Sequence, residues 1–247
     1  MGKTKYFHTD TLEPLRILAI VAGTNEPSNS NVLADAFLKG IRTEIPEAQI
    51  EKIRLRDLTL DHFTLQHYDP NSCSTDDFCK TQDAILNSHG MLIATPVWNF
   101  SVPAHLKNFI DRMGSIALDQ EMHAKGQLKN KPFFFIFTGG APKIAWKALL
   151  HITSMHLSEA IKYYQGSIAG KHFEPKCILG RGKFGLVVDK RPESLAAMEE
   201  KGRRFARVVA TYEKTGKLPF WLGLRTRVSM WIYRIGNRVM YPISALQ

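Results

Sequence analysis

A polar turn near the N-terminus carries the first group of residues whose types and spacing suggest a ligand site. Gly23-Thr24-Asn25-Glu26-Pro27-Ser28-Asn29-Ser30-Asn31 follows an apolar run and enters a helical pattern over 32–41. Backbone amides and the dipole at a helix N-terminus bind anions. Capping the helix needs only one Ser or Asn, so this crowding of hydroxyls and amides favours a phosphate monoester over capping alone. The predicted phosphate contacts are Thr24, Ser28, Ser30 and Asn31.

A second turn is both polar and aromatic. Thr95-Pro96-Val97-Trp98-Asn99-Phe100 lies between an apolar run and a helix with Pro103 in its first turn. Proline is tolerated there because the missing N–H would have no helical partner. Ligands of open α/β sheets bind beyond the carboxyl ends of the strands, so this turn is a candidate contact for a planar, hydrogen-bonding ring. The structural alternative is an ordinary strand–helix connection with a buried Trp.

Alternating strands and helices position both turns. Apolar or alternating runs predict strands at 15–22, 49–55, 90–95, 133–137 and 160–168, and helices at 32–41, 74–88, 102–117, 142–157 and 192–214. Strands and helices that alternate at this spacing imply a parallel, doubly wound sheet. We therefore expect one domain over 15–216, a lead-in over 1–14 and a basic extension over 217–247.

The two turns together resemble the NADPH-dependent FMN reductase family of flavodoxin-like proteins. The resemblance rests on Gly23-Thr24 and Ser30-Asn31, and on 95–100 leading into Pro103-x-x-Leu106-Lys107-Asn108-x-x-Asp111-Arg112. Trp98-Asn99-Phe100 is also similar to the FMN-dependent azoreductases and quinone reductases. Leu55-Arg56-Asp57-Leu58 and Thr138-Gly139-Gly140-Ala141-Pro142 fit the end of that family's second strand and a second flavin-contacting loop. The chain departs from the family at Glu26, where many members carry an Arg.

The resemblance implies a flavodoxin-like three-layer α/β sandwich with a five-stranded parallel sheet and FMN between the first and third strands. It implies an FMN-dependent oxidoreductase that passes two electrons from NADPH or NADH to a quinone, an azo or nitro compound, a metal oxyanion or free flavin. Hydride transfer is the chemistry of the flavin itself, so no catalytic side chain is predicted. The implied contacts with the flavin ring are Pro96, Val97, Trp98, Asn99 and Phe100, with Thr138, Gly139 and Gly140 on its other side.

Three other functions are alternatives to this hypothesis. The chain could be a non-enzymatic electron carrier, an FMN-binding partner protein, or a basic adaptor that has lost its flavin. Flavodoxins proper are usually acidic, and the net charge of +10 argues against a carrier. A homodimer is what the family suggests.

The positive charge is concentrated at the C-terminal end. Residues 190–247 have a net charge of +8, and 218–247 contain four arginines and no acidic residue. Val228, Ile232, Ile235 and Val239 form an apolar seam at helical spacing. Such a helix can pack on the domain or on a second subunit, which is the favoured interpretation, or lie at a membrane surface. No recognised motif suggests a nucleic-acid partner.

The remaining features of the sequence argue against a secreted protein, a membrane-spanning protein, a metal-cluster protein and a protein kinase. The N-terminus has no apolar signal-peptide core, and no run of 18 apolar residues is present that could span a membrane as a helix. Cys73, Cys79 and Cys177 are too few for a disulfide framework, which predicts a protein of the reducing cytoplasm. They are also too few for a four-cysteine cluster, and no metal site is predicted. The segment 179–187 fits the glycine-rich loop of protein kinases, but the other kinase motifs are absent from the 62 residues after Gly185. We interpret it as a tight turn between two short extended pieces.

Overall fold

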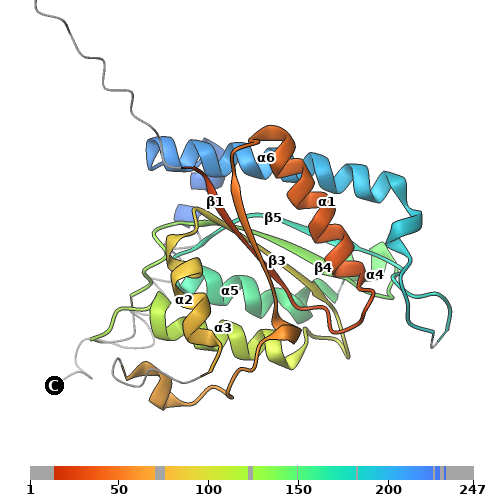
Figure 1. Ribbon diagram of the computed structural model, residues 1–247, viewed down its shortest axis with the longest axis horizontal. Coiled ribbons are helices and arrows are strands. Elements are labelled where there is room, and N and C mark those ends of the chain that lie inside the picture. The colour runs from red at the N-terminus through yellow and green to blue at the C-terminus, as the bar shows by residue number, and fades with distance from the viewer. Residues whose placement is uncertain are drawn as a thin grey trace, which may run out of the picture.

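Five strands form one parallel sheet in the computed structural model of this chain, which describes residues 14–69, 76–121, 125–148, 150–181, 183–224, 226–228 and 231. The strands pair in the order β2-β1-β3-β4-β5 (Figure 1). They are β1 (Arg16–Val21), β2 (Gln49–Arg54), β3 (Gly90–Pro96), β4 (Pro132–Thr138) and β5 (Ser167–Glu174). This is the strand order of flavodoxin-like folds, and it confirms the predicted fold class.

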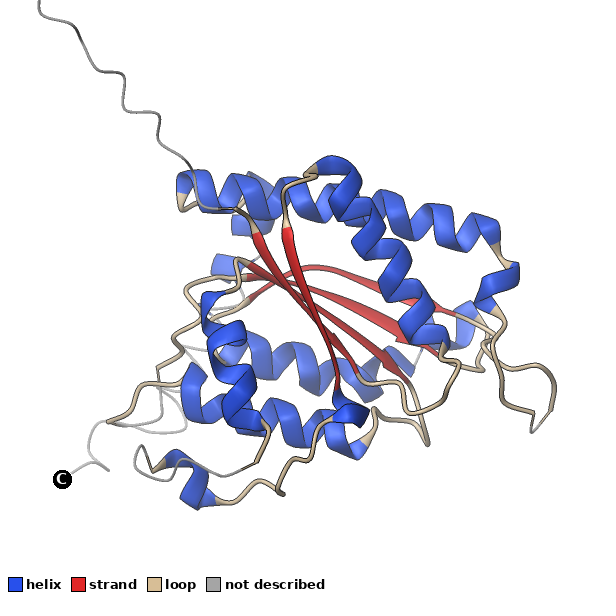
Figure 2. Ribbon diagram, viewed as in Figure 1, coloured by secondary structure: helices blue, strands red, loops and turns tan. Residues whose placement is uncertain are grey.

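Helices cover both faces of the sheet, as Figure 2 shows. On one face lie α1 (Asn29–Glu44) and α6 (Pro192–Thr215); on the other lie α2 (Phe78–Asn87), α3 (Ala104–Ala117) and α5 (Met155–Tyr163). Successive strand residues point to opposite faces, so Ile17 and Ala19 pack against the first pair of helices and Leu18 and Ile20 against the second group. Coverage on both sides explains the near-continuous apolar strands.

The predicted fifth strand at 160–168 is wrong over most of its length. Residues 155–163 form α5, which buries Leu157, Ser158 and Ile161 on one side, and β5 begins only at Ser167. A short apolar run does not distinguish a buried strand from the buried side of a helix. The single helix predicted over 142–157 is also wrong, because α4 (Lys143–Ala148) is followed by a 3₁₀ helix (Leu150–Ser154) before α5 begins.

The predicted helix boundaries agree better with the observed ones where a proline or a glycine lies at the end of the helix. Helix α6 begins at Pro192 and ends at Thr215, and Gly216 follows it as a C-cap with a φ of 64°, the left-handed conformation that glycine favours. Helix α1 begins at Asn29, three residues before the predicted start. Helix α2 begins at Phe78, and the predicted start at Ser74 lies outside the described residues.

The kinase-like segment forms the predicted tight turn. The backbone N–H of Leu179 donates to the Lys183 carbonyl at 2.9 Å, and the N–H of Lys183 donates to the Gly180 carbonyl at 3.0 Å. The second extended piece, 184–187, belongs to no strand, and a 3₁₀ helix (Val188–Lys190) follows it directly.

Only part of the C-terminal extension is described. A helical segment at 220–224 leaves Phe220 and Trp221 more than 70% exposed. Val228 is half exposed, and the other three members of the predicted seam lie outside the described residues. Within the described chain, no helix combines the length and apolar character needed to cross a bilayer.

Candidate functional site

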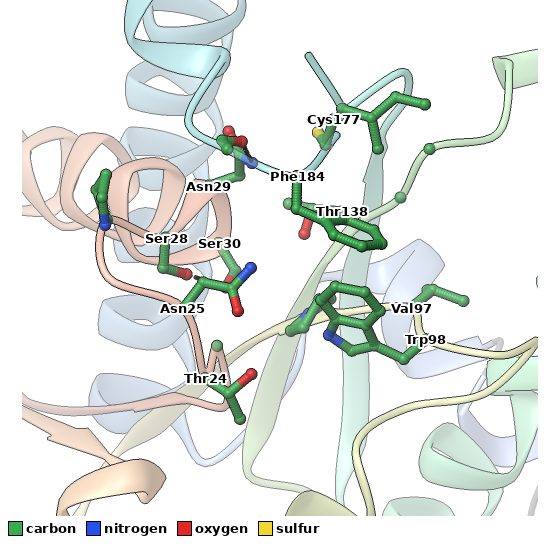
Figure 3. A pocket seen from close by; sticks show the side chains of 17 residues that line it. Thr24, Asn25, Ser28, Asn29, Ser30, Val97, Trp98, Thr138, Cys177 and Phe184 are labelled. Atoms are coloured by element: carbon green, nitrogen blue, oxygen red, sulfur yellow. Dashed lines mark hydrogen bonds between the residues drawn. The ribbon is translucent and has the colours of Figure 1, made fainter. Parts of the chain in front are cut away.

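A cavity of about 160 Å³ lies at the carboxyl ends of β1, β3 and β4 (Figure 3). It is the point where the chain order reverses, because β1 has β2 on one side and β3 on the other. Open α/β sheets bind ligands at such a switch point. Three loops that are far apart in the sequence therefore meet at one cavity.

Nine of the twelve predicted site residues line this cavity. They are Thr24, Ser28 and Ser30 after β1, Pro96, Val97 and Trp98 at the end of β3, and Thr138, Gly139 and Gly140 at the end of β4. The other three, Asn31, Asn99 and Phe100, lie outside its lining.

The side chain of Asn31 is engaged on the outer surface of α1. Its Nδ2 donates to Asp35 Oδ2 at 3.3 Å, and its Oδ1 accepts from Lys52 Nζ at 3.3 Å. Only its backbone N–H is directed to the start of the helix, where it donates to Ser28 Oγ at 3.4 Å. A phosphate contact through the Asn31 side chain stays a prediction that this geometry does not favour.

Asn99 and Phe100 form the tip of a tight turn. Trp98 and Ser101 exchange two backbone hydrogen bonds of 2.7 and 2.9 Å around them. Both tip residues have positive φ, 48° and 63°, as the central residues of a type I′ turn do. The turn directs Trp98 to the cavity and leaves Phe100 73% exposed.

The end of the cavity at the start of α1 is called the anionic end here, because the predicted phosphate would lie there. It is built from buried hydroxyls. Ser28 caps the helix, whereas the capping alternative would assign this role to Ser30 or Asn31 and is wrong about the residue; the Oγ of Ser28 lies 2.9 Å from Ser30 Oγ. Gly23 permits this packing, because a Cβ there would lie 2.2 Å from Ser28 Oγ and 2.6 Å from Ser30 Oγ. The first-turn amides of a helix lack partners within it. The described lining holds no Lys or Arg, so hydroxyls, amides and the helix dipole are the groups that can bind an anion here.

Two arginines, Arg54 at the end of β2 and Arg56 just after it, bind the carboxylate of Glu26, where the chain departs from the family. Arg54 Nη2 donates to Glu26 Oε2 at 2.5 Å, and Arg56 Nη1 donates to the same oxygen at 3.3 Å. Arg56 Nη1 also donates to the carbonyl of Thr24 at 3.2 Å. Asp57 pairs with the same two arginines, with its Oδ2 3.2 Å from Arg54 Nε and its Oδ1 3.7 Å from Arg56 Nε. Two cations and two carboxylates therefore lie beside the anionic end of the cavity, and their formal charges cancel.

The other end of the cavity is apolar and closely packed. The backbone N–H of Val97 donates to the Thr138 carbonyl at 2.7 Å, which ties the two loops together. A Cβ at Gly139 would lie 3.0 Å from the Phe173 ring, so a larger residue would have to displace that ring. A Cβ at Gly140 would lie 3.3 Å from Ile178 Cγ2, so the absence of side chains at 139 and 140 allows this loop to pack closely against Phe173 and Ile178.

A fourth segment, after β5, was not predicted to be part of the site. It contributes Cys177, Ile178, Phe184 and Gly185, and the turn after β1 adds Asn25 and Asn29. The interpretation of 179–187 as a plain turn left it out, although a correctly placed fifth strand would have directed it to the same edge of the sheet. Burial raises the pKa of the Cys177 thiol to about 12, so this residue is a neutral thiol at physiological pH.

The base of this segment is held by a buried carboxylate. Glu174 accepts hydrogen bonds from Arg191 Nη1 at 2.9 Å and from Ser194 Oγ at 3.0 Å, and its other oxygen lies 3.1 Å from His172 Nε2. Burial raises the pKa of Glu174, but the hydrogen bonds from His172, Arg191 and Ser194 outweigh it and hold the pKa below its usual value.

Fold and site together define a flavodoxin-like α/β protein with a cavity at its switch point. The model of the NADPH-dependent FMN reductase family matches residues 15–161, which is more than half of the chain. This chain therefore belongs to the NADPH-dependent FMN reductase family, and the predicted resemblance is confirmed.

Curated relatives and solved structures are consistent with this family. The chain is 28% identical over 137 residues to an FMN-dependent NADH:quinone oxidoreductase of Alcanivorax borkumensis, covering 48% of this chain and 66% of that protein. It is 26% identical over 102 residues to an FMN-dependent NADH:quinone oxidoreductase of Mycoplasma pneumoniae, covering 40% of this chain and 52% of that protein. The matches thus span less than two thirds of either relative. The structure of an NAD(P)H:quinone oxidoreductase from Methanothermobacter marburgensis superposes with a TM-score of 0.59 at 13% identity, covering 77% of this chain and 96% of that one; at this identity it shows a common fold.

Proposed function

We propose that this chain is an FMN-dependent NAD(P)H oxidoreductase that carries its flavin in the switch-point cavity and reduces a small planar acceptor. The observation that carries the proposal is the meeting of three loops, after β1, β3 and β4, at one cavity. One end of that cavity is hydroxylic and lies at a helix N-terminus, and the other end is aromatic and glycine-lined. This division matches the anionic and the tricyclic ends of FMN.

The hydroxyl groups and backbone amides of the first loop would hold the phosphate. Thr24 and Asn25 have exposed side chains at the cavity, and Ser28 and Ser30 form its buried floor. Hydrogen bonds to a charged group contribute about 1.5–3 kcal/mol each. Several such donors at a helix N-terminus can bind a phosphate without a basic side chain in contact.

Trp98 and the pair Gly139-Gly140 would bound the ring. When bound, FMN would supply hydride transfer between a nicotinamide and an acceptor. The residues of the chain would bind and orient the ring and exclude water from its buried side. The cavity volume of about 160 Å³ is below the roughly 300 Å³ at which ligand pockets usually begin. Part of the ring would therefore lie at the rim of the cavity, where a nicotinamide and an acceptor can reach it in turn.

Quinones are the acceptor class that we favour, because the relatives from Alcanivorax borkumensis and Mycoplasma pneumoniae are both named as NADH:quinone oxidoreductases. A ring exposed at the rim would also suit azo and nitro compounds. We also propose that the chain forms a homodimer, as the family resemblance suggests. Sedimentation of the full-length chain measures that state directly.

The test of the proposed activity is anaerobic reduction of the flavin. The full chain is loaded with FMN, freed of excess flavin, and mixed with NADPH or NADH in the absence of oxygen. Bleaching of the oxidised flavin spectrum, followed by its return when a benzoquinone is added, is the expected result. Stable FMN binding without reduction by either nicotinamide would identify an electron carrier instead and would overturn the proposed enzyme activity.

A further inference from the structure

The segment after β5 brings an aromatic side chain to the mouth of the cavity. The ring centroid of Phe184 lies 4.9 Å from that of Trp98, with the two planes tilted by 59°. Figure 3 shows the two rings side by side, facing Ser28 and Asn25 across the cavity. Phe184 lines the cavity and is still 60% exposed. An aromatic ring in this position offers an apolar face to a planar ligand at the rim.

The side-chain amide of Asn29 fixes the backbone next to Phe184. Its Nδ2 donates to the Gly185 carbonyl at 2.8 Å. Its Oδ1 accepts from the backbone N–H groups of Val187 at 2.9 Å and Val188 at 3.2 Å. These partners lie 156 to 159 residues further along the chain. Asn29, the first residue of α1, therefore ties the segment that carries Phe184 to the start of this helix.

The other end of the same segment is attached to the loop after β4. The backbone N–H of Cys177 donates to the Gly139 carbonyl at 2.9 Å, and that of Lys176 donates to the Ala141 carbonyl at 3.2 Å. The segment is thus tied to the ring end of the cavity at one side and to its anionic end at the other. These ties define the position of Phe184 even though its ring is mostly exposed.

We propose that Phe184 forms, together with Trp98, the aromatic wall that contacts the flavin ring, and that Asn29 is the residue that positions this wall. The proposal rests on the proposed function, because it assumes that the ring end of the flavin lies at this rim. Asn29 acts here through the backbone of 185–188 and not through the phosphate. Its effect should therefore appear with a flavin that has no phosphate.

Titration with riboflavin, which has no phosphate, tests the wall separately from the anionic end. Flavin fluorescence is followed as the full chain is added, because contact with an aromatic side chain quenches it. Phe184→Ala is expected to weaken riboflavin binding about 5- to 10-fold, as expected for the loss of one aromatic pair, and to reduce the quenching at saturation. Phe184→Tyr keeps a ring and should behave like the wild type. Phe220→Ala, which removes a phenylalanine that is 72% exposed outside the cavity lining, is the matched control and should change neither quantity.

A double-mutant cycle tests the positioning role. Asn29→Ala should weaken riboflavin binding by a similar factor, and adding Phe184→Ala to it should cause little further loss, because both changes remove the same wall. Multiplying losses in the double mutant would overturn the role of Asn29. Unchanged affinity and quenching in Phe184→Ala would overturn the wall while FMN binding, and with it the proposed function, still stood. A wild-type chain that bound neither flavin would overturn the proposed function itself.

Discussion

Replacing Gly23 with alanine should disturb the anionic end of the site and leave the ring end unchanged. A Cβ at this position would lie 2.2 Å from Ser28 Oγ, 2.6 Å from Ser30 Oγ and 3.2 Å from Ser28 Cβ. Rotating one hydroxyl does not relieve all three contacts, so Gly23→Ala should displace Ser28 from its capping position and break its hydrogen bond to Ser30. The ring end of the cavity is built from other loops and should stay as it is.

The size of the effect follows from the interactions that are lost. Losing the N-cap costs about 1 kcal/mol, and losing a buried hydroxyl hydrogen bond costs about 1 kcal/mol. We therefore expect the free energy of unfolding to fall by about 2 kcal/mol, or roughly 4–8 °C in Tm for a chain of this size. Losing one hydrogen bond to the phosphate, worth about 2 kcal/mol, should weaken FMN binding about 30-fold.

Comparing two ligands makes the measurement specific. FMN and riboflavin are titrated into the wild type, Gly23→Ala and the control Gly223→Ala, where the nearest atom to an added Cβ lies 3.6 Å away. The affinity for FMN should fall about 30-fold in Gly23→Ala, whereas the affinity for riboflavin should change little and the control should match the wild type. An equal loss for both ligands would refute the assignment of this loop to the phosphate, and so would an unchanged FMN affinity.

Three further substitutions test the surroundings of the site. Glu26→Gln removes one of the two carboxylates that pair with Arg54 and Arg56 beside the anionic end and leaves only Asp57, so FMN affinity measured by fluorescence titration should rise about 2- to 5-fold; a decrease would contradict this electrostatic interpretation. Arg112→Met removes the cationic partner of Asp76, and because both side chains are at most 3% exposed, urea denaturation should show a loss of about 3–5 kcal/mol in the free energy of unfolding. If the free energy of unfolding fell by less than about 1 kcal/mol, the pair would contribute no more than an exposed ion pair, which would contradict this expectation. Glu174→Gln should destabilise the protein by about 1–3 kcal/mol at neutral pH. The pKa of Glu174 is lowered in the folded state, so the difference in stability between the wild type and Glu174→Gln should shrink as the pH falls below about 4.5, the ordinary pKa of a glutamate. A difference in stability that is equal at pH 7 and at about pH 3.5 would show that protonation of Glu174 is not coupled to folding.

The sequence predicts the parts of this fold that local chemistry specifies. The first four strands are apolar or alternating runs bounded by polar turns, and the last core helix has proline at its start and glycine after its end. Both signals depend on neighbouring residues alone. The fifth strand was misplaced because Ile161 and its neighbours look equally apolar on a helix and on a strand, and only their packing against the sheet decides between the two.

For the site as well, the sequence predicts the groups that lie within a few residues of one another, but not those that distant segments bring together. The turns at 23–31 and 95–100 are recognisable because each combines its ligand-binding groups within a few residues. Phe184 and Asn29 escape such recognition, since they act together across 156 or more residues of chain. The same holds for Arg54, whose relation to Glu26 exists only because β1 and β2 are neighbours in the sheet.

The measurement that tests the central claim most directly is a crystal structure of the full chain grown with FMN. The account predicts the phosphate within hydrogen-bonding distance of the turn that begins α1, and the ring between Trp98 and the Gly139-Gly140 loop. Flavin bound elsewhere on the molecule, or bound here in the reversed orientation with its phosphate at Trp98, would contradict it.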